Sequence, residues 1–191
     1  METIVSICLG IGLSAACGFR VFVPLLFMNL ASLSGHLALA HGFEWIGSYP
    51  ALVTFSVATV LEIAGYYIPW VDHLLDTLAT PAAVVAGTVV TAALVTDMSP
   101  LLKWTLAAIA GGGVAGVVQG TTVLARGAST ATTGGLANPL VSTAELAAAA
   151  ITSVLALLVP VVLVVVMLVL AAVFGRKLAR RLRKAQTVAA L

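Results

Sequence analysis

Long apolar stretches with almost no charged residues are the feature that most constrains this chain. The last of them, residues 140–174, contains a single charged side chain, Glu145. As one straight helix it would be about 50 Å long, whereas the hydrocarbon core of a bilayer is about 30 Å thick. Only 8% of the 191 residues are charged, which is far below the roughly 25% that a water-facing surface requires. The sequence therefore predicts an all-α membrane protein that has the lipid bilayer as its main partner, and it gives no indication of nucleic-acid binding.

Five apolar stretches are separated by polar or proline-containing segments, and they cover residues 3–33, 51–68, 82–95, 101–118 and 140–174. The first is too long for one straight span and is interrupted at Gly18, Phe19 and Arg20. The fourth is interrupted by the polar residues 119–122. Pro160 divides the last stretch into two short spans, or else kinks a single helix. We therefore predict a polytopic helix bundle of about six spans.

The two interrupted stretches share a spacing of small residues. Each carries three of them four positions apart, followed directly by the break, at Gly10, Ser14 and Gly18 and at Gly112, Gly116 and Gly120. Ile68-Pro69 has a counterpart in Val159-Pro160. These matches predict a 3+3 inverted repeat with two interrupted helices, formed by residues 1–97 and 98–175 and followed by a basic tail at 176–191. In transporters built this way the binding site lies at the breaks. The alternative is that the small residues only let helices pack closely.

Six basic residues between 176 and 184 directly follow the last apolar stretch. Basic residues at the end of a span favour the cytoplasmic side, so the C-terminus is predicted to be cytoplasmic. Six spans would place the N-terminus there as well, with residues 34–50 and 97–100 on the outer side. The predicted location is the cytoplasmic (inner) membrane of a bacterium. The tail could also contact anionic lipid.

Glu62 is the most informative ionisable residue, because it lies inside the second apolar stretch. A carboxylate in lipid must be paired, hydrated or protonated, and such residues commonly mark ion or substrate pathways. Arg20, at the first break, is its predicted partner, although such a pair could equally be structural. We predict a pathway at the two breaks that is lined by Gly18, Arg20, Glu62, Gln119, Thr121 and Thr122.

Asp72, His73 and Asp76 form a D-H-x-x-D set whose members are neighbours on one face of a helix. Two carboxylates and an imidazole at this spacing suit a transition metal, so a divalent cation is a possible cofactor. The same residues could instead belong to an amphipathic helix at the membrane interface, or relay protons toward Glu62. Glu145 is explained more simply as a carboxylate at a helix N-terminus, with Ser142 or Thr143 as the N-cap.

The run from Glu62 to Pro81, EIAGYYIPWVDHLLDTLATP, resembles the central signature of an uncharacterised bacterial inner-membrane family, domain of unknown function 4126. A glycine-rich broken helix near the start, the segment FEWIG at 43–47 and the apolar-then-basic ending extend the resemblance over nearly the whole chain. Tyr66 and Tyr67 stand where family members often carry a charged residue. The resemblance implies a membrane protein and no particular activity.

These observations favour a small transporter or channel for an ion or small solute. The alternative is a lipid-binding or scaffold protein that transports nothing. A membrane enzyme that uses Asp72, His73 and Asp76 ranks last, because the sequence contains no nucleophile elbow, Walker loop, HExxH or CxxC motif. We therefore expect no enzymatic activity. The rows of small residues also offer faces for a homodimer.

Overall fold

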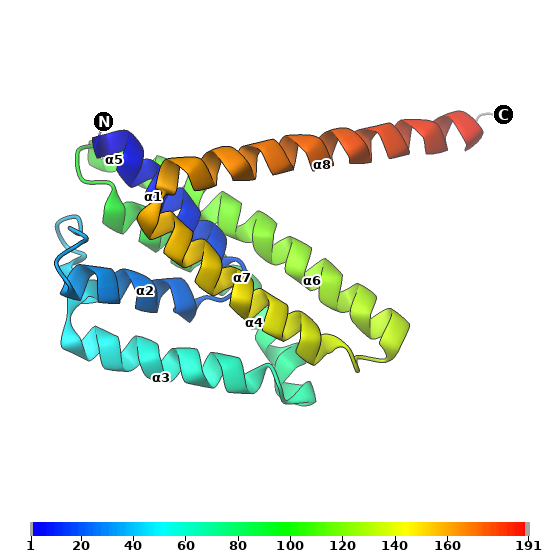
Figure 1. The fold of residues 1–191 in the computed structure, drawn as a ribbon, viewed down its shortest axis with the longest axis horizontal. Helices are drawn as coiled ribbons and strands as arrows, with labels where there is room; N and C mark the ends of the chain where they lie inside the picture. Colours follow the sequence, from blue (N-terminus) through cyan, green and yellow to red (C-terminus); the bar gives the residue numbers. More distant parts are fainter. Residues whose placement is uncertain (1, 190–191) are drawn as a thin grey trace.

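The computed structural model describes the backbone of residues 2–189, and their side chains except at 69, 70, 72, 73, 178, 179 and 181–189. The regular secondary structure of this part of the chain is entirely helical, with no strand (Figure 1). The helices are α1 (Glu2–Cys17), α2 (Phe22–Leu33), a 3-10 turn (Glu44–Gly47), α3 (Tyr49–Gly65), α4 (Pro69–Leu94), α5 (Pro100–Leu106), α6 (Gly113–Thr133), α7 (Asn138–Leu158) and α8 (Pro160–Ala189). A π-helical segment, Ala107–Gly112, joins α5 to α6 without a break.

The helices confirm an all-α membrane protein. Four helical segments are long and apolar enough to cross a bilayer, namely Leu74–Leu94, Pro100–Thr133, Asn138–Leu158 and Pro160–Lys177. The remaining apolar helices, α1, α2 and α3, are shorter. Prolines stand in the first turn of most of the later helices, where a missing N–H costs no hydrogen bond. Pro81 differs, because it lies inside α4 and does not open a span there as the sequence analysis predicted.

Two of the three predicted interruptions are present. α1 ends at Cys17 and α2 begins at Phe22, so the chain breaks at residues 18–21. α7 ends at Leu158 and α8 begins at Pro160, which makes the last apolar stretch two helices. The predicted break at 119–122 is wrong, because α6 runs through it. Thr121 and Thr122 donate hydrogen bonds to the carbonyls of Val118 and Gln119, so their hydroxyls are satisfied without unwinding the helix.

α1 and α2 form a helical hairpin whose outer ends lie at the same end of the bundle (Figure 1). α1 runs antiparallel to α4, since Gly10 packs on Thr91 and the Ser14 hydroxyl donates to the Gly87 carbonyl. Beyond α2, the Ala40 amide donates to the Ala93 carbonyl near the end of α4 at 2.7 Å. The loops that follow α2 and α4 therefore lie at the same end of the bundle, and the break at 18–21 lies toward the opposite end.

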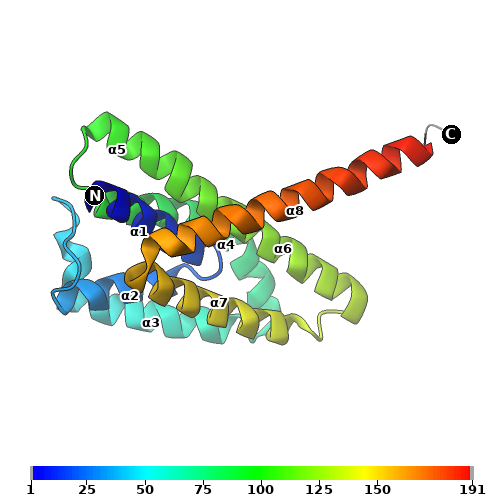
Figure 2. The ribbon, with the colours of Figure 1, turned by 45° about the horizontal axis from the view of Figure 1, so that its top comes forward.

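The inverted repeat of residues 1–97 and 98–175 stays a prediction. α3 and α7 run in opposite directions, and so do α4 and α8 (Figures 1 and 2). α1 and α6 do not follow this plan. Gly112 of the π segment faces Thr88 and Gly116 of α6 faces Val84, so α6 is antiparallel to α4 in the same way as α1.

The small residues of α1 serve packing inside the bundle. An added Cβ at Gly10 would lie 3.2 Å from the Thr91 Cα, and one at Gly18 would lie 2.6 Å from the Ala115 carbonyl oxygen. This row is therefore occupied by α4 and the α6 segment and is closed to a second copy of the chain. In the second row, Gly120 has open space around its Cα. The possible homodimer stays a prediction, and it could not use the row at Gly10, Ser14 and Gly18.

Candidate functional site

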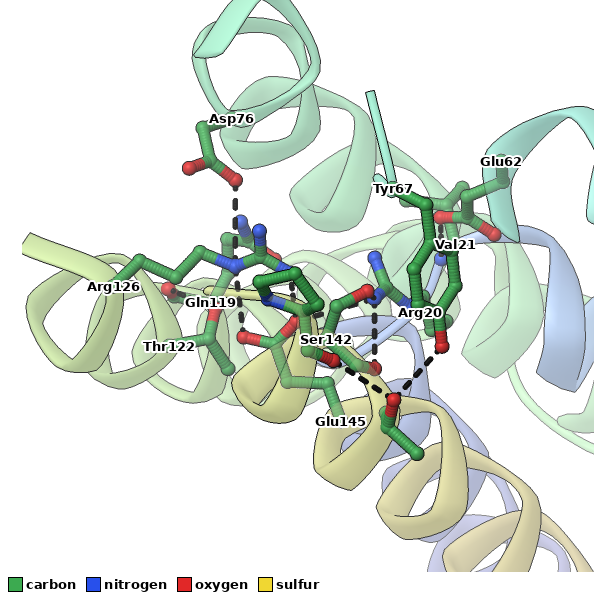
Figure 3. Close-up of polar contacts among 12 residues, drawn as sticks. Arg20, Val21, Glu62, Tyr67, Asp76, Gln119, Thr122, Arg126, Ser142 and Glu145 are labelled. Carbon is green, nitrogen blue, oxygen red and sulfur yellow. Dashed lines mark hydrogen bonds and ion pairs between the residues drawn. The ribbon is translucent and has the colours of Figure 1, made fainter. Parts of the chain in front are cut away.

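Five charged side chains from five segments meet near one end of the bundle (Figure 3). We call them the charge cluster: Arg20 of the break, Glu62 of α3, Asp76 of α4, Arg126 of α6 and Glu145 of α7. Each of the four helical members lies within about two turns of the end or start of its helix, and the break brings Arg20 to the same level. The cluster therefore lies toward one surface of the bundle, although Glu62 had been predicted deep inside a span.

Glu145 is the central acceptor of the charge cluster. One carboxylate oxygen accepts from the Arg126 Nε at 3.0 Å, and the other accepts from the Arg126 Nη2. The second oxygen also lies 3.4 Å from the Arg20 Nη2, and the Arg20 and Glu145 side chains are only 1% and 7% exposed. Charges so removed from water must be paired, because an isolated buried ion costs several kcal/mol.

The two guanidinium groups also share the ring of Tyr66. The Cζ atoms of Arg20 and Arg126 lie 3.7 Å and 4.3 Å from the ring centroid. Arg20 donates further hydrogen bonds to the Ser142 carbonyl at 3.0 Å and to its hydroxyl at 2.5 Å. The π-face of the ring, the carboxylate and the serine together offset the repulsion between two buried cations.

Asp76 completes the cluster on the α4 side. Its Oδ1 lies 3.7 Å from the Arg126 Nε, and its side chain is about one quarter exposed, at 24%. Arg126 therefore lies between two carboxylates from different helices, Asp76 of α4 and Glu145 of α7. This arrangement ties α4, α6 and α7 together at the level of the break.

Glu62 has a different partner from the one predicted. Its two carboxylate oxygens accept hydrogen bonds from the backbone amides of Val21 and Phe22, at 2.8 Å and 3.1 Å. These amides stand at the start of α2, where no preceding helical turn supplies carbonyl acceptors for them. The helix dipole also favours an anion at this end. Arg20 forms its ion pair with Glu145, so the predicted Arg20–Glu62 pair is wrong. The break is what creates the free amides that Glu62 binds.

The break lies between two cavities. One, of about 430 Å³, has mostly apolar walls from α2, α3 and α4 and includes Glu62 and Tyr66. The other, of about 300 Å³, lies between the break, α6 and α7 and includes Glu145 with the predicted pathway residues Thr121 and Thr122. A carboxylate of the charge cluster therefore borders each cavity.

The other predicted pathway residues line neither cavity. Gly18 packs against Ala115 and Val118 of α6, and Gln119 is buried within the bundle. Arg20 lies beside the two cavities, since Phe19 borders the cavity at Glu145 and Val21 borders the one at Glu62.

The predicted metal set is only partly described by the structure. The side chains of Asp72 and His73 lie outside the described residues, and Asp76 faces Arg126. Among the side chains that the structure does describe, no group of three His, Cys, Asp or Glu residues is placed to hold a metal ion. The divalent-cation site therefore stays a prediction.

Arg126 was not among the residues predicted from the sequence. It is the one charged residue of α6, and an isolated ionisable residue in an apolar helix is the signal that would have identified it. The interpretation of Glu145 as a residue at a helix N-terminus is wrong. α7 begins at Asn138, two turns earlier, and Ser142 accepts from Arg20 and caps no helix.

Comparison with known proteins places nearly the whole chain in one family. A family model described as "Domain of unknown function (DUF4126)" matches residues 7–180, a range that contains every member of the charge cluster. No curated protein and no solved structure matches the chain.

Proposed function

Because this chain belongs to the family described as domain of unknown function (DUF4126), whose description gives no activity, we propose a function from the site. We propose that the protein is a small transporter or channel, and that an ion or small solute passes at the break between α1 and α2. The observation that carries this proposal is the position of the break, between two cavities that each expose a carboxylate of the charge cluster.

The local chemistry supports this reading. A broken helix presents backbone groups that no turn satisfies, and membrane transporters use such groups to bind ions and substrates. Here the amides of Val21 and Phe22, which no helical turn satisfies, donate hydrogen bonds to the Glu62 carboxylate. Protonation or displacement of this carboxylate would release them, so Glu62 is the group we propose to couple binding to a change at the break.

Flux measurements in proteoliposomes test the proposal. We expect wild-type protein to move protons, a common cation or a small anion, and Glu62→Gln to slow that movement at least tenfold. Thr122→Val, which keeps the shape of a residue lining the second cavity, should change the rate without unfolding the protein. Glu44→Gln, at an exposed site in the loop before α3, is the matched control. Wild-type protein that moves none of these ions would end the proposal.

The location follows from the basic residues after the last span. We propose that this end of α8, together with the charge cluster, faces the cytoplasm of a bacterial inner membrane. In both views the two ends of the described chain lie at opposite ends of the molecule (Figures 1 and 2). This arrangement favours an outer N-terminus over the cytoplasmic one that six spans would give. We also propose that the protein is no enzyme.

A further inference from the structure

A third cavity, of about 720 Å³, lies between α1, α6 and α8. Its walls are almost entirely apolar and include Ile11 of α1, Phe19 of the break, Val117 of α6, and Leu163 and Met167 of α8. Only 6% of the residues in the Pro160–Lys177 segment of α8 are buried inside the protein. The cavity, which we call the α8 groove, is therefore bounded on one side by a helix that mostly faces the bilayer.

The α8 groove runs along the helices. Its lining residues on α8 run from Leu163 to Ala171, and those on the α6 side run from Ile109 to Val118. Eight residues of helix correspond to roughly 12 Å, which is a large part of one leaflet of a 30 Å hydrocarbon core. Its length and apolar lining suit an acyl chain that lies along the bilayer normal.

The end of the groove nearest the charge cluster carries positive charge. Arg176, Lys177 and Arg180 follow the lining residues of α8 directly and are exposed. The sequence contains no acidic residue after Glu145, so α8 supplies no carboxylate of its own to neutralise them. Lys177 comes seven residues after Leu170, a spacing that returns to the same face of a helix. A positive charge therefore lies where the groove meets the membrane surface.

We infer that the α8 groove binds one anionic phospholipid, with an acyl chain against α1, α6 and α8 and its phosphate at Lys177. A second copy of the chain fits less well, because pairing two parallel α8 helices would bring their basic residues together. The inference is independent of the proposed transport, since it uses none of the residues of the charge cluster.

Spin-label spectroscopy tests the inference. Purified protein would be reconstituted in phosphatidylcholine vesicles that contain a trace of phosphatidylglycerol or phosphatidylcholine spin-labelled on one acyl chain. We expect the phosphatidylglycerol label to be motionally restricted by the protein, with a relative association constant at least threefold above that of the phosphatidylcholine label. Equal restriction of the two labels by the wild-type protein would overturn the inference.

Two pairs of variants locate the site. Gly113→Phe should fill the groove and abolish the preference, since nothing lies within 4 Å of an added Cβ there, and Gly120→Phe is its control at an equally open position outside the groove. Lys177→Gln should remove most of the preference, because one basic group at an anionic surface contributes up to about fivefold in affinity. Arg176→Gln, on another face of α8, should change it less. Equal losses in both members of either pair would show diffuse surface attraction and refute the site.

Discussion

At the scale of single residues, Glu145 has the largest structural role in the charge cluster. It is the carboxylate that both buried arginines share, since Arg126 bonds both of its oxygens and Arg20 lies 3.4 Å from one of them. Removing its charge leaves two guanidinium groups close together, with Asp76 as the nearest remaining partner of one of them. The stability of the charge cluster is therefore sensitive to a single substitution at Glu145, whatever the net contribution of its intact ion pairs.

We predict that Glu145→Gln lowers the free energy of unfolding by about 3–5 kcal/mol, the usual result of stranding a buried charge. Thermal unfolding of the purified protein in detergent measures the loss. Glu44→Gln is the control, because Glu44 and its partner His41 are both exposed to water, so this change should leave the unfolding temperature almost unchanged. A Glu145→Gln protein as stable as wild type would show that the cluster is open to water.

Residue patterns predicted the features that are local. The break at 18–21 and the division at Pro160 follow from glycine and proline, whose backbone preferences act wherever the residues occur. The partners of Arg20 and Glu62 were not predictable in this way. They depend on how α2 turns back after the break and on where α7 packs, which no local spacing encodes. The polar residues at 119–122 do not break α6, because threonine hydroxyls can form hydrogen bonds within their own helix.

At the scale of elements, the hairpin of α1 and α2 depends on a carboxylate from a third helix. Glu62 of α3 bonds the first amides of α2, and Asn29 near the other end of α2 donates to the Ile46 and Ser48 carbonyls. α2 is thus fixed at both ends by neighbouring segments. Its position follows from these bonds as much as from apolar packing.

We predict that Glu62→Gln loosens the start of α2. The amide group of glutamine keeps one acceptor oxygen but places an NH₂ toward the second backbone amide, which costs about 1–3 kcal/mol. Hydrogen exchange should be faster at Val21 and Phe22 than in wild type, while exchange in α7 stays the same. Unchanged exchange at these two amides would show that Glu62 does not hold them.

Substitutions of glycine should distinguish packing positions from open ones. In Gly18→Ala the added Cβ would lie 2.6 Å from both the Ala115 carbonyl oxygen and the Val118 Cβ, so we expect a loss of about 1–3 kcal/mol. In Gly120→Ala the Cβ meets nothing within 4 Å, and removing a helical glycine should stabilise α6 by up to about 1 kcal/mol. Thermal unfolding of the two variants should therefore shift in opposite directions. Similar shifts would contradict the packing of α1 against α6.

At the scale of the whole molecule, the helices define two ends. The loops after α2 and α4 lie together at one end, joined by the bond from Ala40 to Ala93. The turn between α6 and α7 lies at the other end, with the charge cluster. The uncharged helical segment between Lys103 and Arg126, from Trp104 to Ala125, is about 33 Å long. This length matches the thickness of the hydrocarbon core of a bilayer.

Cysteine labelling in intact cells checks this division. With Cys8 and Cys17 replaced by alanine, single cysteines at the exposed positions His36, Asp97 and Leu136 would be treated with a membrane-impermeant maleimide. We expect His36→Cys and Asp97→Cys to react from the same side of the membrane. Leu136→Cys should react only after the membrane is permeabilised and the reagent reaches the other side. Reaction of all three from one side would contradict the arrangement of α4, α6 and α7 in the membrane.

The distance along the chain between Arg20 and its partners has a consequence for biosynthesis. Arg20 bonds Ser142, 122 positions later, whereas Glu62 reaches Val21 after 41 positions. At about 5–20 residues per second, the ribosome delivers α7 on the order of ten seconds after Arg20 has emerged. During that interval the first hairpin can be closed by Glu62, but its arginine must stay hydrated near the membrane surface. The hairpin can therefore settle to its final depth only after α7 inserts, which makes the arrival of α7 the step that commits the nascent chain to its native arrangement.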